Sequence, residues 1–370
     1  MDSLQYKIAI TLVRGIGTAL AKNLIAYLGN EEAVFKESPQ ALAKIPGIGD
    51  VLSREITTSN ALQRAAEEIE FIEKNKIECF YFNDKNYPYR LKECSDAPIM
   101  LYSKGKGSLN EAKFIGIVGT RNATEQGRDN CRRLIADLRS VMPSAVIVSG
   151  LAYGVDICAH KAALDAGMAT FGVVGHGLDR IYPAMHRSTA VRMLENGRLL
   201  TEYLSRTNPD RQNFVQRNRI IAGMCDATVV VESAARGGAL LTADAATSYN
   251  RDVFAFPGRV GDEWSAGCNA LIKSNRAALI ECADDLLNFM CWEKQDAGHP
   301  KFVQTTLFPD LNENEMLLFT LLRQFPDGLQ LNDLAIRTAM PVSKVSAMLL
   351  GMEFKGLVRI SPGNLYRIVK

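Results

Sequence analysis

The 370-residue sequence lacks the features that mark several classes of protein. Its eight cysteines include no Cys-x-x-Cys pair and no zinc-type spacing, so we expect reduced thiols, no disulfide framework and no metal site. No apolar run approaches the ~20 residues of a membrane helix. The N-terminal stretch MDSLQYKIAI has no apolar core of the signal-peptide kind. These absences predict a cytoplasmic protein with no membrane partner.

The sequence also has no large excess of basic or of acidic residues. Lys and Arg number 43 against 41 Asp and Glu, a net charge of +2, which excludes a uniformly basic coat protein and an acidic disordered tail. A local basic groove stays open, because net charge says nothing about distribution. Neither G-x-G-x-x-G nor the P-loop pattern G-x-x-x-x-G-K-[ST] occurs at the expected places, which argues against a nicotinamide enzyme and an NTPase. We expect no cofactor.

Composition and pattern divide the chain into four parts. Residues 1–75 have helical periodicity, and residues 76–290 form a core whose extension, 76–112, is irregular, aromatic and proline-containing. Residues 291–311 have the composition of a linker, and 312–370 form a last compact module. The length fits two or three domains.

The first part carries a weak internal repeat. Val13–Leu20 and Ile45–Leu52 each place an apolar-x-Gly-Ile-Gly turn before a helix, which is the helix-hairpin-helix pattern. Backbone N–H groups at such a helix start can face a phosphate. A plain αα-hairpin whose Gly-x-Gly is only a turn explains the same residues equally well.

The core alternates β-branched runs with amphipathic helical runs. Such alternation predicts βαβ units and a mostly parallel, Rossmann-like doubly wound α/β sheet, with ligands bound beyond the carboxyl ends of its strands. The expected strands are 113–119, 145–149, 170–174, 198–201, 227–231 and 252–255, and the expected helices are 125–139, 155–166, 185–196 and 239–249.

The ends of these strands carry glycines, arginines and hydroxyls. Four arginines against one aspartate make residues 206–219 the most cationic stretch of the core. Guanidinium forks match phosphate oxygens, so a shared rim predicts a phosphate-rich ligand. Each arginine alone is also explained as a solvated or paired charge, and each glycine as close helix packing. The candidate binding residues are Gly119, Thr120, Arg121, Ser149, Gly150, Gly154, Arg217, Asn218, Arg219, Arg236 and Gly238. His160 is expected to be a packed, hydrogen-bonded histidine.

In ordered blocks the core resembles the DNA processing protein A (DprA/Smf) family. The matching segments are IGIVGTRNATEQG at 115–127, SGLAYGVDICAHKAAL at 149–164, GHGLDRIYP at 175–183, FVQRNRIIAG at 214–223 and VVVESAARGGALLTADAA at 229–246. The resemblance implies a non-enzymatic protein that binds single-stranded DNA, protects incoming strands, loads RecA recombinase in natural transformation and forms a homodimer. It also implies an N-terminal helical domain of helix-hairpin-helix or SAM-like type and a C-terminal winged helix.

The resemblance also assigns roles to residues. Arg121, Arg217 and Arg219 would contact phosphates, and Ser149, Gly150 and Gly238 would allow close backbone approach. Tyr153, Tyr182, Tyr203 and Phe214 lie near the proposed rim, where single-stranded binding needs surfaces for stacking. Packing in the core or at the rim explains any one of these rings equally well. One departure is Gly237-Gly238-Ala239, where the family usually has Ser-Gly-Ser. It removes two hydroxyl donors and leaves the backbone amides.

A second function fits the same crevice, cleavage of nucleoside monophosphates by a phosphoribohydrolase. Such enzymes carry a Pro-Gly-Gly-x-Gly-Thr run and a catalytic glutamate, whereas this chain has Pro257-Gly258-Arg259 and lacks the rest. We therefore predict no catalytic residue.

The last module reads as three helices, 313–325, 331–338 and 342–355, followed by a hairpin around 362–364. This is the order of a winged helix. Its third helix is apolar at Met348, Leu349, Leu350 and Met352 and poor in Lys and Arg. That composition favours a protein-contact or structural role over double-stranded DNA binding.

Overall fold

The computed structural model describes residues 3–110, 112–294, 311–325, 328–355, 357–361 and 365–368. The chain forms two compact units, Met1–Gly298 and His299–Lys370, which are treated separately. Most of the predicted linker at 291–311 and the predicted turn at 362–364 lie outside the described residues. No helix in the described part combines the length and apolar character needed to span a bilayer.

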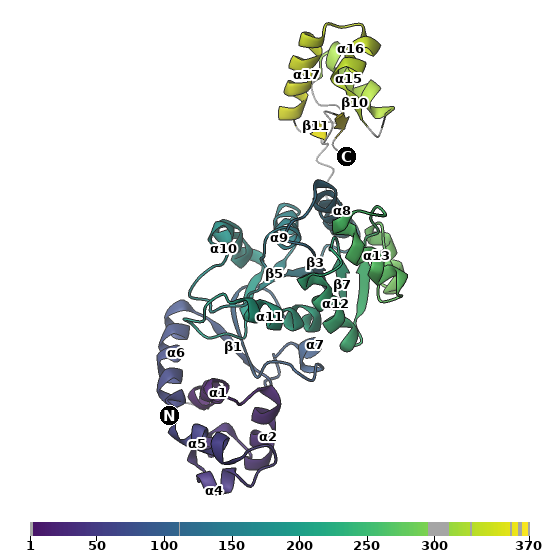
Figure 1. Ribbon diagram of the computed structural model, residues 1–370. Coiled ribbons are helices and arrows are strands. Elements are labelled where there is room, and N and C mark those ends of the chain that lie inside the picture. Colours follow the sequence, from purple (N-terminus) through teal and green to yellow (C-terminus); the bar gives the residue numbers. More distant parts are fainter. Residues whose placement is uncertain are drawn as a thin grey trace. The chain divides into compact units, whose positions relative to one another are not determined.

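Residues 3–75 are helical, as predicted, and their glycine turns join helices into two hairpins (Figure 1). Gly15 and Gly47 turn the chain at φ +83° and +86°, which only glycine adopts without strain. A Cβ on Gly15 would stand 2.8 Å from Leu52, and one on Gly47 would stand 2.8 Å from Leu20. Each turn therefore packs against the other hairpin. The helices are α1 (Ser3–Leu12), α2 (Thr18–Leu28), α3 (Glu31–Lys36), α4 (Pro39–Leu42), α5 (Asp50–Thr58) and α6 (Ala61–Asn75).

A nine-stranded sheet forms the centre of the first unit, in the order β1-β2-β6-β5-β4-β3-β7-β8-β9. The seven strands from β6 to β9 in this order are parallel, so the predicted Rossmann-like sheet is confirmed. The strands are β1 (Glu78–Tyr81), β2 (Met100–Gly105), β3 (Phe114–Val118), β4 (Val146–Ser149), β5 (Thr170–Val173), β6 (Arg198–Thr201), β7 (Ala227–Val230), β8 (Asp252–Ala255) and β9 (Ala278–Leu279).

The segment 76–112 is more ordered than its sequence predicts. Strands β1 and β2 pair with each other, and β2 adds to β6, both antiparallel. The short helix α7 (Tyr89–Lys92) lies between them along the chain. Ile99, Met100 and Tyr102 share a core with α1 to α6, so these edge strands join the helical region to the sheet.

Alternate residues of the parallel strands bury opposite faces of the sheet. In β3, Phe114 and Val118 belong to one core cluster, and Ile115 and Ile117 to another. Helices α11 and α12 cover the first face, and α8 and α9 cover the second (Figure 1). Helix α14 packs on the second face as well. The helices are α8 (Glu125–Val141), α9 (Val155–Asp165), α10 (Arg187–Asn196), α11 (Arg211–Met224), α12 (Gly238–Ser248), α13 (Ala266–Lys273) and α14 (Ala283–Phe289).

The direction in which successive strands are added to the sheet reverses at β3. Strands β4, β5 and β6 follow β3 to one side, whereas β7, β8 and β9 lie on its other side. Loops that leave the carboxyl ends of β3 and β7 therefore diverge and leave a crevice, which is where open α/β sheets bind ligands.

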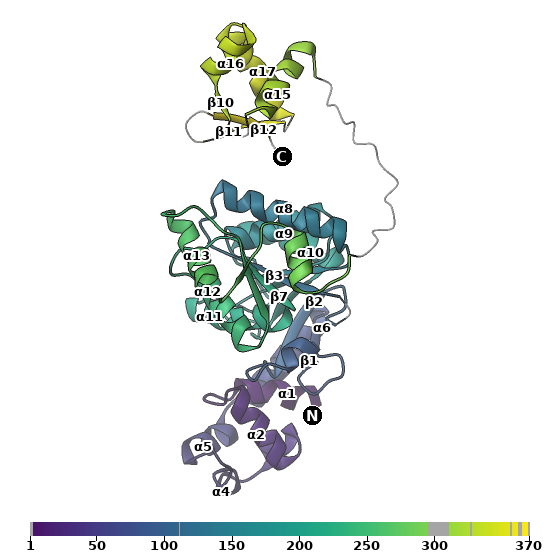
Figure 2. The same cartoon turned by 90° about the vertical axis from the view of Figure 1, so that its right-hand side faces the viewer.

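The second unit is a winged helix, as predicted (Figure 2). Its apolar core includes Leu318, Leu334 and Leu349, one from each helix. The helices are α15 (Glu313–Arg323), α16 (Leu331–Thr338) and α17 (Val342–Phe354). Strands β11 (Val358–Ser361) and β12 (Leu365–Ile368) form the wing, and β10 (Leu329–Gln330) adds a third strand that the sequence did not predict.

Candidate functional site

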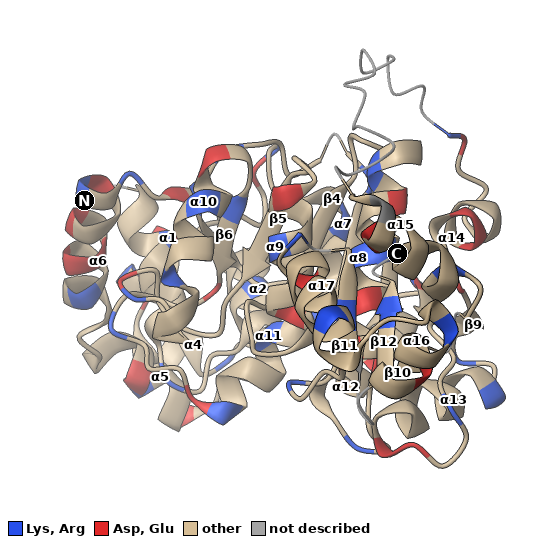
Figure 3. Ribbon diagram, turned by 90° about the horizontal axis from the view of Figure 1, so that it is seen from above, with Lys and Arg blue, Asp and Glu red and all other residues tan. Residues whose placement is uncertain are grey.

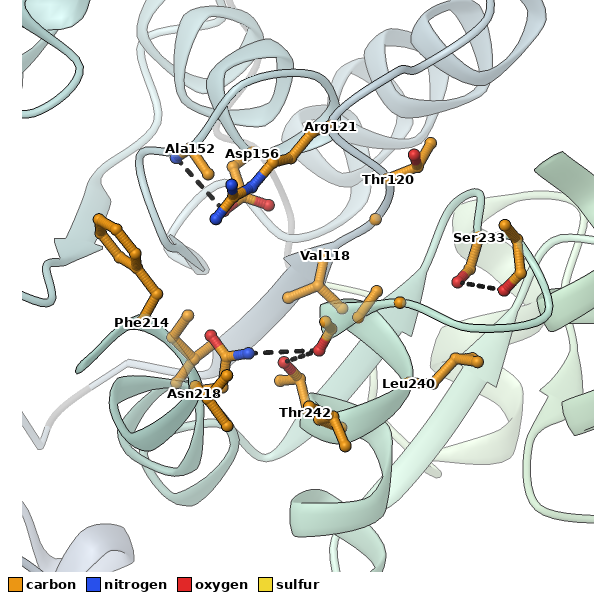
Figure 4. A pocket seen from close by; sticks show the side chains of 18 of the residues that line it. Val118, Thr120, Arg121, Ala152, Asp156, Phe214, Asn218, Ser233, Leu240 and Thr242 are labelled. Carbon is orange, nitrogen blue, oxygen red and sulfur yellow. Dashed lines mark hydrogen bonds between the residues drawn. The ribbon is translucent and has the colours of Figure 1, made fainter. Parts of the chain in front are cut away.

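A groove of about 720 Å³ opens at the point where the sheet reverses. Its walls come from the end of β3, from α11, and from the loop that joins β7 to α12 (Figure 4). Of the predicted binding residues, Gly119, Thr120, Arg121, Arg217, Asn218, Arg236 and Gly238 line it. Segments far apart in the sequence thus meet at one concave surface.

Three exposed arginines reach this groove from three different segments: Arg121 after β3, Arg211 at the start of α11, and Arg236 after β7. Within the described residues, no carboxylate pairs with any of them and no hydrogen bond holds their guanidinium groups. Elsewhere basic and acidic residues are interspersed, for example along α6 (Figure 3). Convergent, unpaired cations make the groove a local anion-binding surface on a nearly neutral molecule.

Two helices begin at the groove with free backbone N–H groups. Helix α12 starts at Gly238 after the N-cap Gly237, and α11 starts at Arg211 after Asp210; no side chain caps either one. Neither helix has an acidic residue in its first turn. The partial positive charge of a helix N-terminus therefore adds to that of the arginines. The backbone amides of α12 are present although the chain has Gly237-Gly238-Ala239 in place of Ser-Gly-Ser.

Aromatic rings lie beside the arginines. The guanidinium carbon of Arg121 lies 5.7 Å from the centre of the Phe214 ring. The Tyr182 ring stacks on Phe214, with centroids 5.7 Å apart and planes 29° apart, and Tyr182 is exposed. This edge of the groove thus presents a cation and π-faces together, which suits a nucleobase next to a phosphate.

Arg217 lies at the floor and is 3% exposed. Its Nη1 donates to the carbonyl of Val173. Asp156, also buried, accepts hydrogen bonds from the backbone N–H groups of Gly150 and Ala152, at 3.2 and 3.4 Å. Burial lowers the pKa of Arg217 to about 10, an effect that Asp156 opposes. Burial raises the pKa of Asp156, an effect that Arg217 opposes. Arg217 thus stays cationic, and its hydrogen bond to Val173 joins α11 to the end of β5.

Three predicted residues support the groove from behind. Ser149 is buried, and its hydroxyl donates to the carbonyl of Ile117 at 2.6 Å, which ties β4 to β3. Gly150 lies against the Arg217 guanidinium, and Gly154 lies against the carbonyl of Thr120. In each case a side chain at the glycine would displace the groove residue beside it.

Arg219 lies outside the groove. Its guanidinium pairs with Glu202 and donates to the carbonyl of Asp96 at 2.7 Å. Burial raises the pKa of Glu202, and Arg219 opposes that rise. The second arginine of the Arg-Asn-Arg run therefore joins α11 to the segment that follows α7.

Two polar residues near the groove, His160 and Glu232, are held by threonines. Thr170 Oγ1 donates to the Ile147 carbonyl, so His160 Nδ1 donates to Thr170 at 2.7 Å and the ring is packed and neutral. Glu232 accepts from the backbone and hydroxyl of Thr124 at 2.8 and 2.6 Å. In the described part of the chain, no cluster of His, Cys, Asp or Glu is able to hold a metal ion.

Several lining residues were absent from the predicted site, Arg211 and Trp264 among them. Arg211 belongs to the cationic stretch 206–219, and its position at the start of α11 is the signal that marks it. Trp264 follows β8 and carries no motif that would have identified it.

Comparison with known proteins adds family relationships. The model of the DNA recombination-mediator protein A family matches residues 78–291, and that of the DprA winged helix domain matches 309–364. Protein Smf from a Synechocystis species is 30% identical, with 98% of each chain covered. DNA processing protein DprA from Streptococcus pneumoniae is 38% identical over 58% of this chain and 75% of its own length.

Solved structures show the same relationship. The X-ray structure of DNA processing protein A from Streptococcus pneumoniae matches with a TM-score of 0.67 and 32% identity, covering 78% of this chain and 98% of that one. The protein from Helicobacter pylori, described for its single-stranded DNA binding mode, matches with a TM-score of 0.52 and 28% identity, covering 58% and 96%.

Proposed function

The chain belongs to the DNA processing protein A (DprA/Smf) family, and we propose that it binds single-stranded DNA in the groove between β3, β7 and α11. The observation that carries the proposal is the convergence of Arg121, Arg211 and Arg236, without carboxylate partners among the described residues, on two uncapped helix N-termini. Phosphates would sit on these groups, as they do at helix N-termini and on arginine forks generally.

The aromatic edge favours single strands over duplexes. Tyr182 and Phe214 offer π-faces next to Arg121. In a duplex each base is already stacked on its neighbours, whereas an unpaired base is free to lie on an aromatic ring. Binding of this kind tolerates any sequence, because every base has a π-face.

The wider role follows from family membership. We propose that the chain protects incoming single strands and delivers them to RecA recombinase during natural transformation, as a homodimer. Contacts made through the sugar–phosphate backbone support that role, since they accept strands of any sequence. No enzymatic step is part of the proposal.

The test is a fluorescence-anisotropy titration of a labelled dT oligonucleotide over a series of salt concentrations, with a duplex of equal length as competitor. Three phosphate contacts predict a log–log salt slope of about −2 and weaker competition by the duplex. No binding at low salt would refute the proposal. Release of free base from nucleoside monophosphates would instead favour the phosphoribohydrolase reading.

A further inference from the structure

Trp264 lines the groove, although no sequence motif marks it. It lies in the 3₁₀ turn Glu263–Ser265, which follows β8 and precedes α13. The ring is half-buried. Within the described part of the chain its indole N–H has no hydrogen-bond partner. Buried tryptophans usually satisfy this donor, so an unpaired indole at a groove wall is available to a ligand.

The backbone around Trp264 is held firmly. Asp262 accepts from the Trp264 N–H at 3.2 Å and from the Ser265 hydroxyl at 3.3 Å. Asn269 exchanges two hydrogen bonds with Gly258, at 3.0 and 3.1 Å, which closes the loop. The backbone that carries the ring is thus ordered before any ligand arrives, which lowers the ordering entropy that binding would cost.

The same loop is tied to the groove wall. The Gly267 N–H donates to the carbonyl of Ser233 at 2.8 Å, and there is no room for a side chain at Gly267 beside Ala234. Ser233 and Phe214 lie on opposite sides of the pocket (Figure 4). Trp264 therefore stands across the groove from the Phe214 edge.

Charge near Trp264 favours a base over a phosphate. Asp262 and Glu263 precede it directly, and carboxylates repel phosphate oxygens. Of the three unpaired cations, Arg121 and Arg211 come from the segments that carry or approach Phe214, and Arg236 comes from the loop between β7 and α12. The Phe214 side of the groove thus carries two of the three unpaired cations, and the two residues directly before Trp264 are acidic.

We propose that Trp264 stacks on a nucleobase of the bound strand, as a second aromatic contact across the groove from Phe214. The proposal rests on the proposed function, because it places a second nucleotide in the same groove. Stacking on an aromatic ring is independent of base identity, so the contact would lengthen the footprint without adding sequence preference.

Intrinsic fluorescence tests this directly, because the sequence contains two tryptophans, Trp264 and Trp292. Trp292 packs on the core of the other sheet face, with Lys113 Nζ 5.2 Å from its ring centre. The Trp292→Phe variant therefore leaves Trp264 as the sole reporter. Its emission should be quenched on titration with a dT oligonucleotide and unchanged by an abasic strand of equal length, which has phosphates but no bases.

Affinity provides the second readout. Trp264→Ala should weaken binding of the dT strand roughly tenfold, leave binding of the abasic strand unchanged, and be rescued in large part by Trp264→Phe. The role of Trp264 would be overturned if Trp264→Ala bound dT as tightly as wild type and the Trp292→Phe variant showed no quenching. The anisotropy titration of the wild type would still show binding in that case. Absence of binding by the wild type would overturn the proposed function itself.

Discussion

The guanidinium of Arg217 lies directly against the backbone of Gly150, so closely that a Cβ on residue 150 would overlap it. Gly150→Ala should therefore push Arg217 away from the Val173 carbonyl and from Asp156. We expect a loss of about 1–3 kcal/mol of unfolding free energy from overpacking, together with weaker binding of dT.

Gly238→Ala is the matched control for stability, because a Cβ there meets its nearest neighbour at an ordinary 3.8 Å. Urea denaturation of both variants measures the difference. A Gly150→Ala protein as stable as wild type would show that the floor of the groove is not packed as described.

Gly237→Ser should restore a helix cap. Residue 237 is the N-cap of α12 in extended conformation, φ −175°, which any residue adopts, and no side chain caps the helix now. A serine hydroxyl would accept a first-turn N–H and reduce the entropy of the unfolded chain, for a gain of roughly 0.3–1 kcal/mol. Chemical denaturation measures the gain. A loss of stability would contradict the geometry assigned to this helix start.

His160 should make the protein less stable in mild acid. Burial lowers its pKa from 6.5 to about 3. Between these values the unfolded chain binds a proton that the folded chain does not. The free energy of unfolding therefore falls as the pH falls below 6.5, and the stability contributed by neutral His160 is fully present above that pH. The slope for one such group is at most about 1.4 kcal/mol per pH unit.

The comparison is with His160→Gln, which cannot titrate. Urea midpoints from pH 7 to 5 should fall more steeply for wild type than for the variant, whatever the variant's stability at neutral pH. Parallel pH curves would mean that folding does not lower the pKa of His160, which would contradict its burial as a neutral ring.

The packing of the two N-terminal hairpins against each other leads to a separate prediction. Gly15→Ala adds a methyl group 2.8 Å from Leu52 at a residue with φ +83° and should destabilise by about 1–3 kcal/mol. Gly17→Ala is the control, because a Cβ there has nothing within 4 Å. Thermal unfolding of the two variants separates them, and equal melting temperatures would contradict the reciprocal packing.

Sequence patterns predicted the parallel sheet because each strand is a short β-branched run followed by an amphipathic helix. They missed β1 and β2, because β2 pairs with β6, about a hundred positions away, and β1 pairs in turn with β2. The Arg-Asn-Arg run predicted two phosphate contacts. Positions two apart on a helix point roughly 200° apart, so Arg217 faces the groove while Arg219 faces Glu202. Only the packing of α11 decides which of the two arginines faces the groove.

The most direct test of the groove compares two charge-matched double variants in the dT titration. Arg121→Ala with Arg211→Ala removes two unpaired cations from the groove, whereas Arg133→Ala with Arg139→Ala removes two exposed arginines from α8, on the other face of the sheet. Circular dichroism checks that both variants are folded. The groove variant should lose at least about tenfold in affinity and reduce the salt slope by about 1.4, and the α8 variant should match wild type. Equal affinity and equal salt slope for the two variants would contradict the assignment of the groove as the strand-binding surface.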